Sequence, residues 1–219
     1  DIRNTPIHKS ADLVNWNFIG TAFTDQTRPS FVPKGGIWAP DINYIDGKYV
    51  LFYSMSVWGG EWTCGIGAAV SDKAEGPFTD RGKLFTSREI DVQNSIDPFF
   101  IEDDGKKYLF WGSFSGIFAI ELTDNGLSIK PDAEKRLVAG TAYEGTYIMK
   151  RGGLYYLFAS TGTCCAHSSA SAGSTTRGSL PRSTGRRAPS AATIRPPTTG
   201  RGRPVPAIAA ASTRGCRAP

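Results

Sequence analysis

The stretch 41-DINYIDGKYVLFYS-54 combines a carboxylate, a short apolar run, a glycine turn and a second apolar run that ends in Ser. The same phrase returns as 97-DPFFIEDDGKKYLFWGS-113 and as 144-EGTYIMKRGGLYYLFAS-160. Each copy predicts a β-hairpin, because two apolar segments rich in Tyr, Phe, Val and Ile flank a polar turn that contains Gly. The chain therefore repeats one supersecondary unit three times.

The spacing of the copies indicates how the units are arranged. Their turn glycines lie about 50 residues apart, a period typical of the blades of a β-propeller. The first strand of each blade lines the axis of a propeller. The leading acids Asp41, Asp97 and Glu144 would then converge on one pocket. Converging carboxylates favour hydrolysis by acid/base catalysis.

Blade boundaries follow from the turns between apolar runs. We expect residues 1–34 to be the outer part of one blade, 35–88 and 89–138 to form two further blades, and 139–163 to begin another. No segment has convincing helical periodicity. The strands expected in the two central blades are 42–45, 49–54, 65–71, an outer segment through 85, 99–102, 107–112, 117–122 and 136–138.

The composition changes sharply after residue 165. Residues 1–165 carry 16 basic and 20 acidic residues and every Lys and aromatic residue of the chain. Residues 166–219, here called the Arg-rich tail, contain nine Arg and no acid, and they alone make the net charge +5. We expect a folded unit at 1–165 and a low-complexity segment at 166–219 that is either disordered or the product of a frameshift.

Charge and hydropathy also bear on partners. The net charge of −4 on residues 1–165 does not favour nucleic acid, and the Arg-rich tail lacks the interleaved aromatics of a nucleic-acid-binding segment. No apolar run reaches 18 residues, so we expect no membrane span. The four cysteines match no zinc or redox spacing. A free buried thiol at Cys64 and a disulfide from Cys64 to Cys164 or Cys165 both fit the sequence.

Three motifs carry a family resemblance. The segments 38-WAPD-41, 94-NSIDP-98 and 143-YEG-145 resemble the motif series of family 43 glycoside hydrolases. Residues 95-SIDP-98 together with 112-GSFSGI-117 look most like the endo-1,5-α-L-arabinanases of that family. The resemblance runs through about residues 1–165. It implies an all-β, five-bladed β-propeller, incomplete in this chain, with about three blades plus part of a first.

The resemblance also implies a mechanism, namely hydrolysis with inversion by separated carboxyl groups. Glu144 matches the general acid, and Asp97 matches the residue whose negative charge raises the pKa of that acid. The general base of the family lies about one blade before 38-WAPD-41, which is upstream of Asp1. Repeat logic would nominate Asp41 as the third acid, but the resemblance makes Asp41 a residue of the pocket wall. We therefore expect this chain by itself to be inactive.

Substrate-binding candidates surround these acids. Trp38 is expected to stack on a sugar ring or to pack between blades, while Asn94, Ser113 and Phe114 join Asp41 as candidates for contacts with sugar. Taken alone, Asp97 before Pro98 would be only a turn cap. Its equivalent position to Glu144 in the repeat favours a functional role instead. Trp58 and Trp62 are candidates for the rim of a cleft, although structural roles are commoner for such residues.

The acid/base steps require no cofactor, and the sequence nominates no metal ligands. An axial calcium or another ion is conceivable only for a complete parent. The expected partner is a plant cell-wall polysaccharide or oligosaccharide, with no nucleic acid and no membrane, in an extracellular or periplasmic setting. Two alternatives stay open. One is a β-xylosidase or α-L-arabinofuranosidase of the same family, and the other is a non-catalytic carbohydrate-binding propeller.

Overall fold

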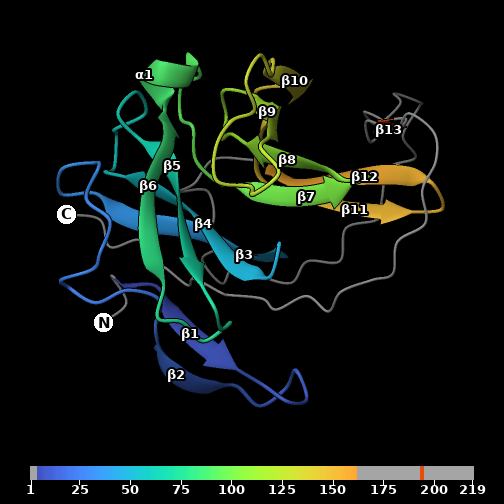
Figure 1. Cartoon of the computed structure of the whole chain (residues 1–219). Coiled ribbons are helices and arrows are strands. Elements are labelled where there is room, and N and C mark those ends of the chain that lie inside the picture. Colours follow the sequence, from blue (N-terminus) through green and yellow to red (C-terminus); the bar gives the residue numbers. More distant parts are fainter. Residues whose placement is uncertain (1–3, 162–192, 195–219) are drawn as a thin grey trace, which may run out of the picture.

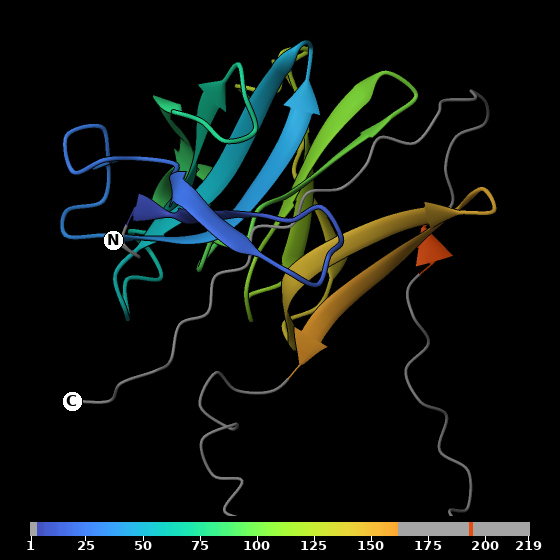
Figure 2. The same ribbon diagram turned by 90° about the horizontal axis from the view of Figure 1, so that it is seen from below.

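The computed structural model describes residues 4–161 and 193–194. Within these residues almost all regular structure is antiparallel β-sheet. Figures 1 and 2 show the sheets following one another in chain order. The first strand β7 (Phe99–Asp103) contacts the first strands of the sheets before and after it, β3 (Gly36–Ile45) and β11 (Tyr143–Arg151). Of the Arg-rich tail, only Thr193–Ile194 belong to the described residues, so the expectation of disorder or a frameshift there lies outside them.

The sheet formed by residues 36–86, here called the central blade, is a complete four-stranded blade. Its strands follow one another in the order β3-β4-β5-β6. They span β3 (Gly36–Ile45), β4 (Lys48–Ser56), β5 (Gly65–Ser71) and β6 (Thr79–Thr86). Strand β3 starts earlier than the sequence predicts, because a bulge between Trp38 and Asp41 lets the strand continue through Pro40. Ala39 within the bulge has a φ of +43°.

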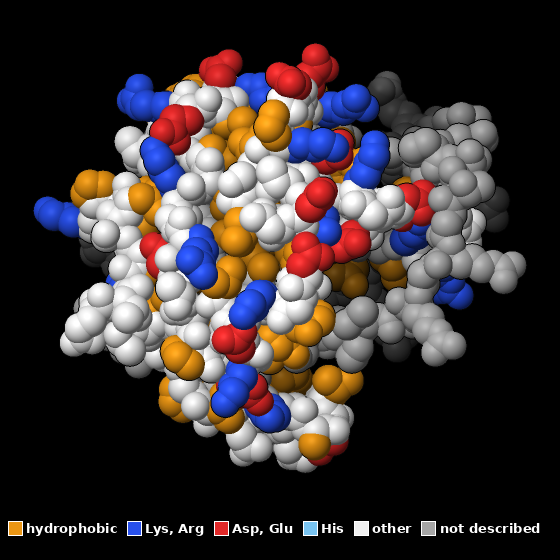
Figure 3. Space-filling view, viewed as in Figure 1, with side chains coloured by type: hydrophobic (Ala, Val, Ile, Leu, Met, Phe, Trp, Pro, Cys, Tyr) orange, Lys and Arg blue, Asp and Glu red, His pale blue; other side chains and the backbone are white. Residues whose placement is uncertain are grey.

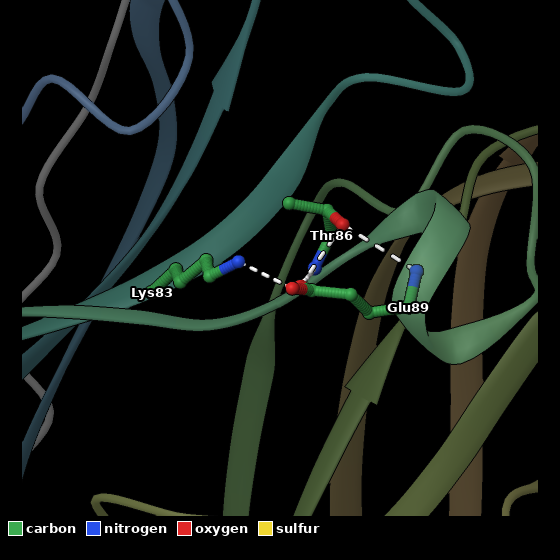
Figure 4. A network of polar contacts seen from close by, with 3 residues as sticks. All are labelled: Lys83, Thr86 and Glu89. Carbon is green, nitrogen blue, oxygen red and sulfur yellow. Dashed lines mark hydrogen bonds and ion pairs between the residues drawn. The ribbon is translucent and has the colours of Figure 1, made fainter.

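A single short helix, α1 (Ser87–Ile90), follows β6. Thr86 caps it, because its side chain accepts from the N–H of Glu89 while the Glu89 carboxylate accepts from the N–H of Thr86. Figure 4 shows this reciprocal pair, with Lys83 binding the same carboxylate. The pattern Thr-x-x-Glu is a capping box, a local signal that periodicity alone does not detect.

A second complete blade follows with strand order β7-β8-β9-β10. Its strands are β7 (Phe99–Asp103), β8 (Lys106–Trp111), β9 (Ile117–Leu122) and β10 (Arg136–Ala139). The last sheet consists of β11 (Tyr143–Arg151), β12 (Leu154–Thr161) and β13 (Thr193–Ile194), and the first of β1 (Pro6–Lys9) and β2 (Asn17–Thr21). These positions confirm the blade boundaries expected from the sequence.

Apolar side chains fill the space between neighbouring sheets. Phe52 of β4 stacks on Phe100 of β7, with ring centroids 5.6 Å apart, and Phe85 of β6 packs at 5.0 Å from Trp111 of β8. On its other face, β4 places Tyr53 against Phe23, which follows β2. The central blade is therefore buried on both faces, and this packing holds its first strand against the first strand of the next blade.

Surface and thiol features complete the description. Cys64 is a free, buried thiol with Sγ 3.1 Å from Ser87 Oγ. Cys164 and Cys165, its partners in the expected disulfide, lie outside the described residues. Over the face drawn in Figure 3, acidic and basic side chains are interspersed. In the described part of the chain no helix is long and apolar enough to cross a membrane.

Candidate active site

Asp41 lies in the innermost strand of the central blade, directly after the bulge in β3. Its Oδ2 accepts the backbone N–H of Phe100 at 2.7 Å and the side-chain amide of Asn43 at 2.9 Å. Burial raises the pKa of Asp41 to about 6, and these two hydrogen bonds moderate the rise. Because Phe100 belongs to β7, the carboxylate joins the first strands of two adjacent blades.

Asp97 lies two residues before β7, the first strand of the next blade. Its N–H donates to Ser54 Oγ at 2.8 Å, and its Oδ2 accepts the N–H of Gly145 at 3.2 Å. Burial, followed by the negative charge of Glu144, raises the pKa of Asp97 to about 7. The residue has a φ of +59°, a left-handed conformation that non-glycine residues adopt at some cost.

Glu144 is the second residue of β11, which is the first strand of the sheet β11-β12-β13. Its Oε2 accepts the hydroxyl of Ser113 at 3.1 Å, and the two residues also form a backbone bridge between blades. Gly145, with φ +65°, lies in the bulge that follows, between Glu144 and Tyr147. The N–H of Gly145, next to Glu144, donates to Asp97, so the backbone beside one acid binds the carboxyl group of the other.

The repeat thus brings its acids onto adjacent inner strands, as expected from the sequence. Asp41 reaches β7 through Phe100, and Asp97 reaches β11 through Gly145. The charge of Glu144 acts on Asp97. This repulsion between like charges adds to burial in raising the pKa of Asp97.

The other candidate residues border this group. The side-chain amide of Asn94 donates to the carbonyl of Ser113 at 3.0 Å, and the N–H of Phe114 donates to the carbonyl of Tyr143 at 2.9 Å. Ser113 is buried and gives its hydroxyl to Glu144. These contacts place Asn94 and Phe114 near Glu144, through Ser113 and Tyr143 respectively. The roles of Asn94, Ser113 and Phe114 in sugar binding stay predictions.

Trp38 lies half-buried three residues before Asp41, the start of the first repeat, and opposite Ser54 in the pairing of β3 with β4. Its indole Nε1 is a buried atom without a hydrogen-bond partner in the described structure. Buried donors in native proteins nearly always find a partner. A ligand hydroxyl or an ordered water would satisfy this one, which supports a binding role beside a packing role.

Sequence reasoning missed three contributors to the site. Ser54 and the N–H of Gly145 hold Asp97, and the carbonyl of Glu61 accepts the N–H of Asn94 at 2.7 Å. The recurrence of Ser at the end of each repeat was the available signal for Ser54. Trp58 and Trp62 flank Glu61 in the same loop and are exposed, so a position at a rim fits them.

The donor set for a metal ion was also compared with the structure. Among residues 4–161 and 193–194, no group of three or more His, Cys, Asp or Glu side chains is placed to hold an ion. No step of the chemistry below passes through a metal ion.

The sequence was then compared with known families. Residues 1–198 match the family model described as glycosyl hydrolases family 43, which extends beyond residue 165 where the composition changes. This chain belongs to glycosyl hydrolase family 43. Its relatives include proteins named as arabinanases.

Two curated relatives are equally similar to the chain. The extracellular endo-α-(1→5)-L-arabinanase 1 of Bacillus subtilis is 35% identical over 175 residues, covering 74% of this chain and 53% of that protein. The extracellular exo-α-(1→5)-L-arabinofuranosidase of Cellvibrio japonicus is 35% identical over 188 residues, covering 73% of this chain and 53% of that protein. The chain spans about half the length of the curated relatives it matches.

A solved structure gives the same result for the fold. The α-L-arabinanase of Cellvibrio cellulosa, in complex with arabinohexaose, superimposes with a TM-score of 0.66 at 29% identity. The match covers 74% of this chain and 59% of that one. The expected fold, a partial β-propeller of this family, is confirmed.

Proposed function

We propose that the protein hydrolyses α-1,5-linked arabinan, or a related arabinose- or xylose-containing plant polysaccharide, with inversion at the anomeric carbon. Glu144 is the general acid, and Asp97 positions it and keeps it protonated. The relatives named for α-1,5-arabinan support the substrate class. The observation that carries the proposal is the coupled pair of carboxyl groups on neighbouring inner strands, joined through Gly145.

In the proposed reaction, the carboxyl group of Glu144 gives its proton to the glycosidic oxygen as the bond to the anomeric carbon breaks. A water molecule attacks that carbon from the opposite face and loses its proton to a general base. The hydroxyl of Ser113 fixes one oxygen of Glu144, which leaves the other free to face the substrate. Ionised Asp97 would oppose a second negative charge on Glu144, and protonated Asp97 would relieve it.

Asp41 is proposed as a residue of the pocket wall. Both of its hydrogen bonds converge on Oδ2, and they come from a backbone N–H and an amide that anchor the neighbouring strand. A carboxylate engaged in this way serves to join two blades. We propose that the base comes from sequence outside these 219 residues, and that the chain by itself binds arabinan without hydrolysing it.

Two alternatives remain testable beside the main proposal. The equal identity to an endo-acting and to an exo-acting relative favours neither an open groove nor a closed pocket, so exo-acting arabinofuranosidase or β-xylosidase activity is the second candidate. A carbohydrate-binding propeller without catalysis is the third, supported by the unpartnered indole of Trp38. Since both relatives are named extracellular, we propose an extracellular or periplasmic location.

The test uses linear α-1,5-arabinan and arabinohexaose. The 219-residue chain should bind arabinohexaose, measured by tryptophan fluorescence, and should release no reducing ends. The gene product including any flanking sequence should hydrolyse arabinan and yield the inverted anomer in the first minutes by NMR. In that protein Glu144→Gln should lower kcat by about 10²–10⁴. Glu121→Gln, the same change at a residue paired with Lys130, should leave kcat unchanged.

Each outcome decides a separate element of the proposal. Neither binding nor hydrolysis of arabinan by either protein would overturn the substrate class. Retention of the anomeric configuration would overturn inversion. Hydrolysis by the 219-residue chain, abolished by Glu144→Ala, would show that the chain contains its own base. Release of arabinose units from chain ends, without early cleavage of internal bonds, would favour the exo-acting alternative.

A further inference from the structure

Ser54 makes a contact that the proposed chemistry does not yet use. It lies near the end of β4, and its side chain is fully buried, with 0% exposed. Its Oγ accepts the N–H of Asp97, 43 residues further along the chain, at 2.8 Å. The hydrogen bond therefore runs from the second strand of one blade to the acid that opens the next blade.

The backbone at Asp97 needs such support. Asp97 is a non-glycine residue with a φ of +59°. This left-handed conformation is unfavourable for L-residues and persists where the surroundings over-determine it. The flanking peptides are held as well. The carbonyl of Ile96 accepts the N–H of Gly112 at 2.8 Å, and the N–H of Ser95 donates to Ser87 Oγ at 3.0 Å. Ser54 supplies the contact at Asp97 itself.

The same relation occurs one blade later. Ser113 stands at the repeat position of Ser54, at the end of the second strand, and only 2% of it is exposed. Its hydroxyl donates to Oε2 of Glu144, the acid of the following blade. In both cases the serine of one blade contacts the acid of the next, although one serine binds a backbone N–H and the other a carboxylate.

We propose that Ser54 and Ser113 are positioning residues, and that the serine closing the second strand of each blade sets the orientation of the acid on the following blade. Ser54 fixes the left-handed peptide from which the Asp97 carboxyl reaches the N–H of Gly145. Ser113 fixes one oxygen of Glu144. Their role in catalysis rests on the proposed function, whereas their control of acid geometry is measurable without it.

A buried serine on the same strand separates positioning from packing. Ser56 lies two residues beyond Ser54, is almost as buried, and donates its hydroxyl to the carbonyl of its own neighbour Val57 at 3.0 Å. Loss of the Ser56 hydroxyl removes this local contact and leaves the hydrogen bond between Ser54 and Asp97 in place. Only loss of the Ser54 hydroxyl releases Asp97.

The experiment follows the carboxyl carbon of Asp97 by NMR in the 219-residue chain. The wild-type carboxyl should titrate near pH 7, because it is enclosed next to Glu144. In Ser54→Ala the freed peptide lets the carboxyl swing toward solvent, so both causes of the raised pKa weaken. We expect its midpoint to fall by one unit or more, on the order of the shifts that burial and a nearby charge produce. Ser56→Ala should lower the melting temperature alone.

A second pair of variants covers a failure of Ser54→Ala to fold. Ser54→Cys nearly keeps the shape of the side chain but replaces the oxygen with a weak acceptor, and Ser56→Cys is its control. The titration midpoint of the Asp97 carboxyl should fall in Ser54→Cys. Ser54→Thr keeps a hydroxyl and should keep the midpoint of the wild type where the variant folds. An unchanged midpoint in folded Ser54→Ala or Ser54→Cys would overturn the proposal for Ser54.

Kinetics add an independent measurement once arabinan hydrolysis has been found. In the active protein Ser54→Ala and Ser113→Ala should lower kcat about tenfold or more with little change in KM, because they misplace a group that acts in the transition state. A rise in KM alone would overturn the positioning role of Ser113. If no variant and no wild-type protein hydrolyses arabinan, the proposed function fails while the NMR titration still decides the positioning of Asp97.

Discussion

Strands β4 and β12 carry the same phrase of the repeat but differ in their surroundings. Phe52 of β4 and Phe158 of β12 both stand two residues before the repeat serine. Phe52 is 0% exposed, because the next blade packs on it through Phe100, whereas Phe158 is 52% exposed. Its cross-strand partner Tyr147 is exposed as well. The two regions teach that burial of a blade is decided by its neighbours and not by its own sequence.

The comparison extends to the electrostatics of the site. Asp41 and Asp97 lie where two sheets meet, and burial is the first cause of the raised pKa of each. Lys150 and Asp103 form an ion pair between the far ends of β11 and β7, where solvent has access to Lys150. Enclosure between blades therefore raises the pKa of Asp41 and of Asp97. At Asp103 burial acts in the same direction, but its hydrogen bonds, led by the one from Lys150, together with the charge of Lys150 outweigh it and leave the pKa lowered.

The largest expected effect tests the two phenylalanines. Phe52→Ala should lower the free energy of unfolding by about 3–5 kcal/mol, because it leaves a cavity against Phe100. Phe158→Ala should lower it by less than about 1 kcal/mol, as for a substitution near the surface. Urea unfolding followed by tryptophan fluorescence measures both. Equal losses would break the comparison, since they would mean that β12 is as enclosed as β4.

A smaller effect concerns pH. The folded pKa of Asp97, about 7, lies above its ordinary value of 3.8, so the folded state binds more protons between about pH 4 and pH 7. The resulting stability is complete below about pH 4 and is lost as the pH rises through 7. Asp97→Asn, which mimics the protonated acid, should therefore be more stable than wild type at pH 8, by about 1–3 kcal/mol.

Melting curves of Asp97→Asn and wild type at pH 5, 6, 7 and 8 would follow this difference. It should widen up to pH 7 and then level off. Asp124→Asn, at an exposed position after β9, serves as the control and should follow wild type at every pH. A constant difference for Asp97→Asn would mean that Asp97 ionises normally, and enclosure between the blades would then not govern its charge.

The smallest effect concerns the ion pair between Lys150 and Asp103. Lys150→Met should lower the free energy of unfolding by about 0.2–1 kcal/mol, because the ion pair with Asp103 is partly exposed. The loss should shrink in 1 M salt, where screening reaches about 3 Å. Guanidinium would screen the pair itself, so urea unfolding at low and high salt is the measurement. A large loss of unfolding free energy that does not depend on salt would mean that the Lys150–Asp103 pair is enclosed.

Much of the fold was readable from the chain. The expected bounds of β5 and β9 agree with the structure, because each apolar run ends at a turn residue. Strand β3 was predicted too short, since Pro40 reads as a strand breaker and the bulge that accommodates it is a backbone event. Helix α1 is too short for periodicity, and only the capping box of Thr86 and Glu89 announces it.

The candidate site was only half readable. The repeat places Asp41, Asp97 and Glu144 on adjacent inner strands, which the contacts through Phe100 and Gly145 bear out. The contact of Ser54 with Asp97 spans 43 residues and depends on the left-handed peptide at Asp97. No local pattern encodes the angle between two blades, so the pairing of each serine with the next acid emerges only from the packed sheets.

The serine contacts also matter for recombining this scaffold with its relatives. Exchange of an entire blade, with crossovers in the loops between sheets, would separate each serine from the acid it holds. Crossovers at the hairpin turns would keep the pairs together, since the segment from Gly47 to Gly105 contains both Ser54 and Asp97. The segment from Gly105 to Gly152 likewise contains Ser113 and Glu144. The modular unit for building chimeras is therefore half of one blade joined to half of the next.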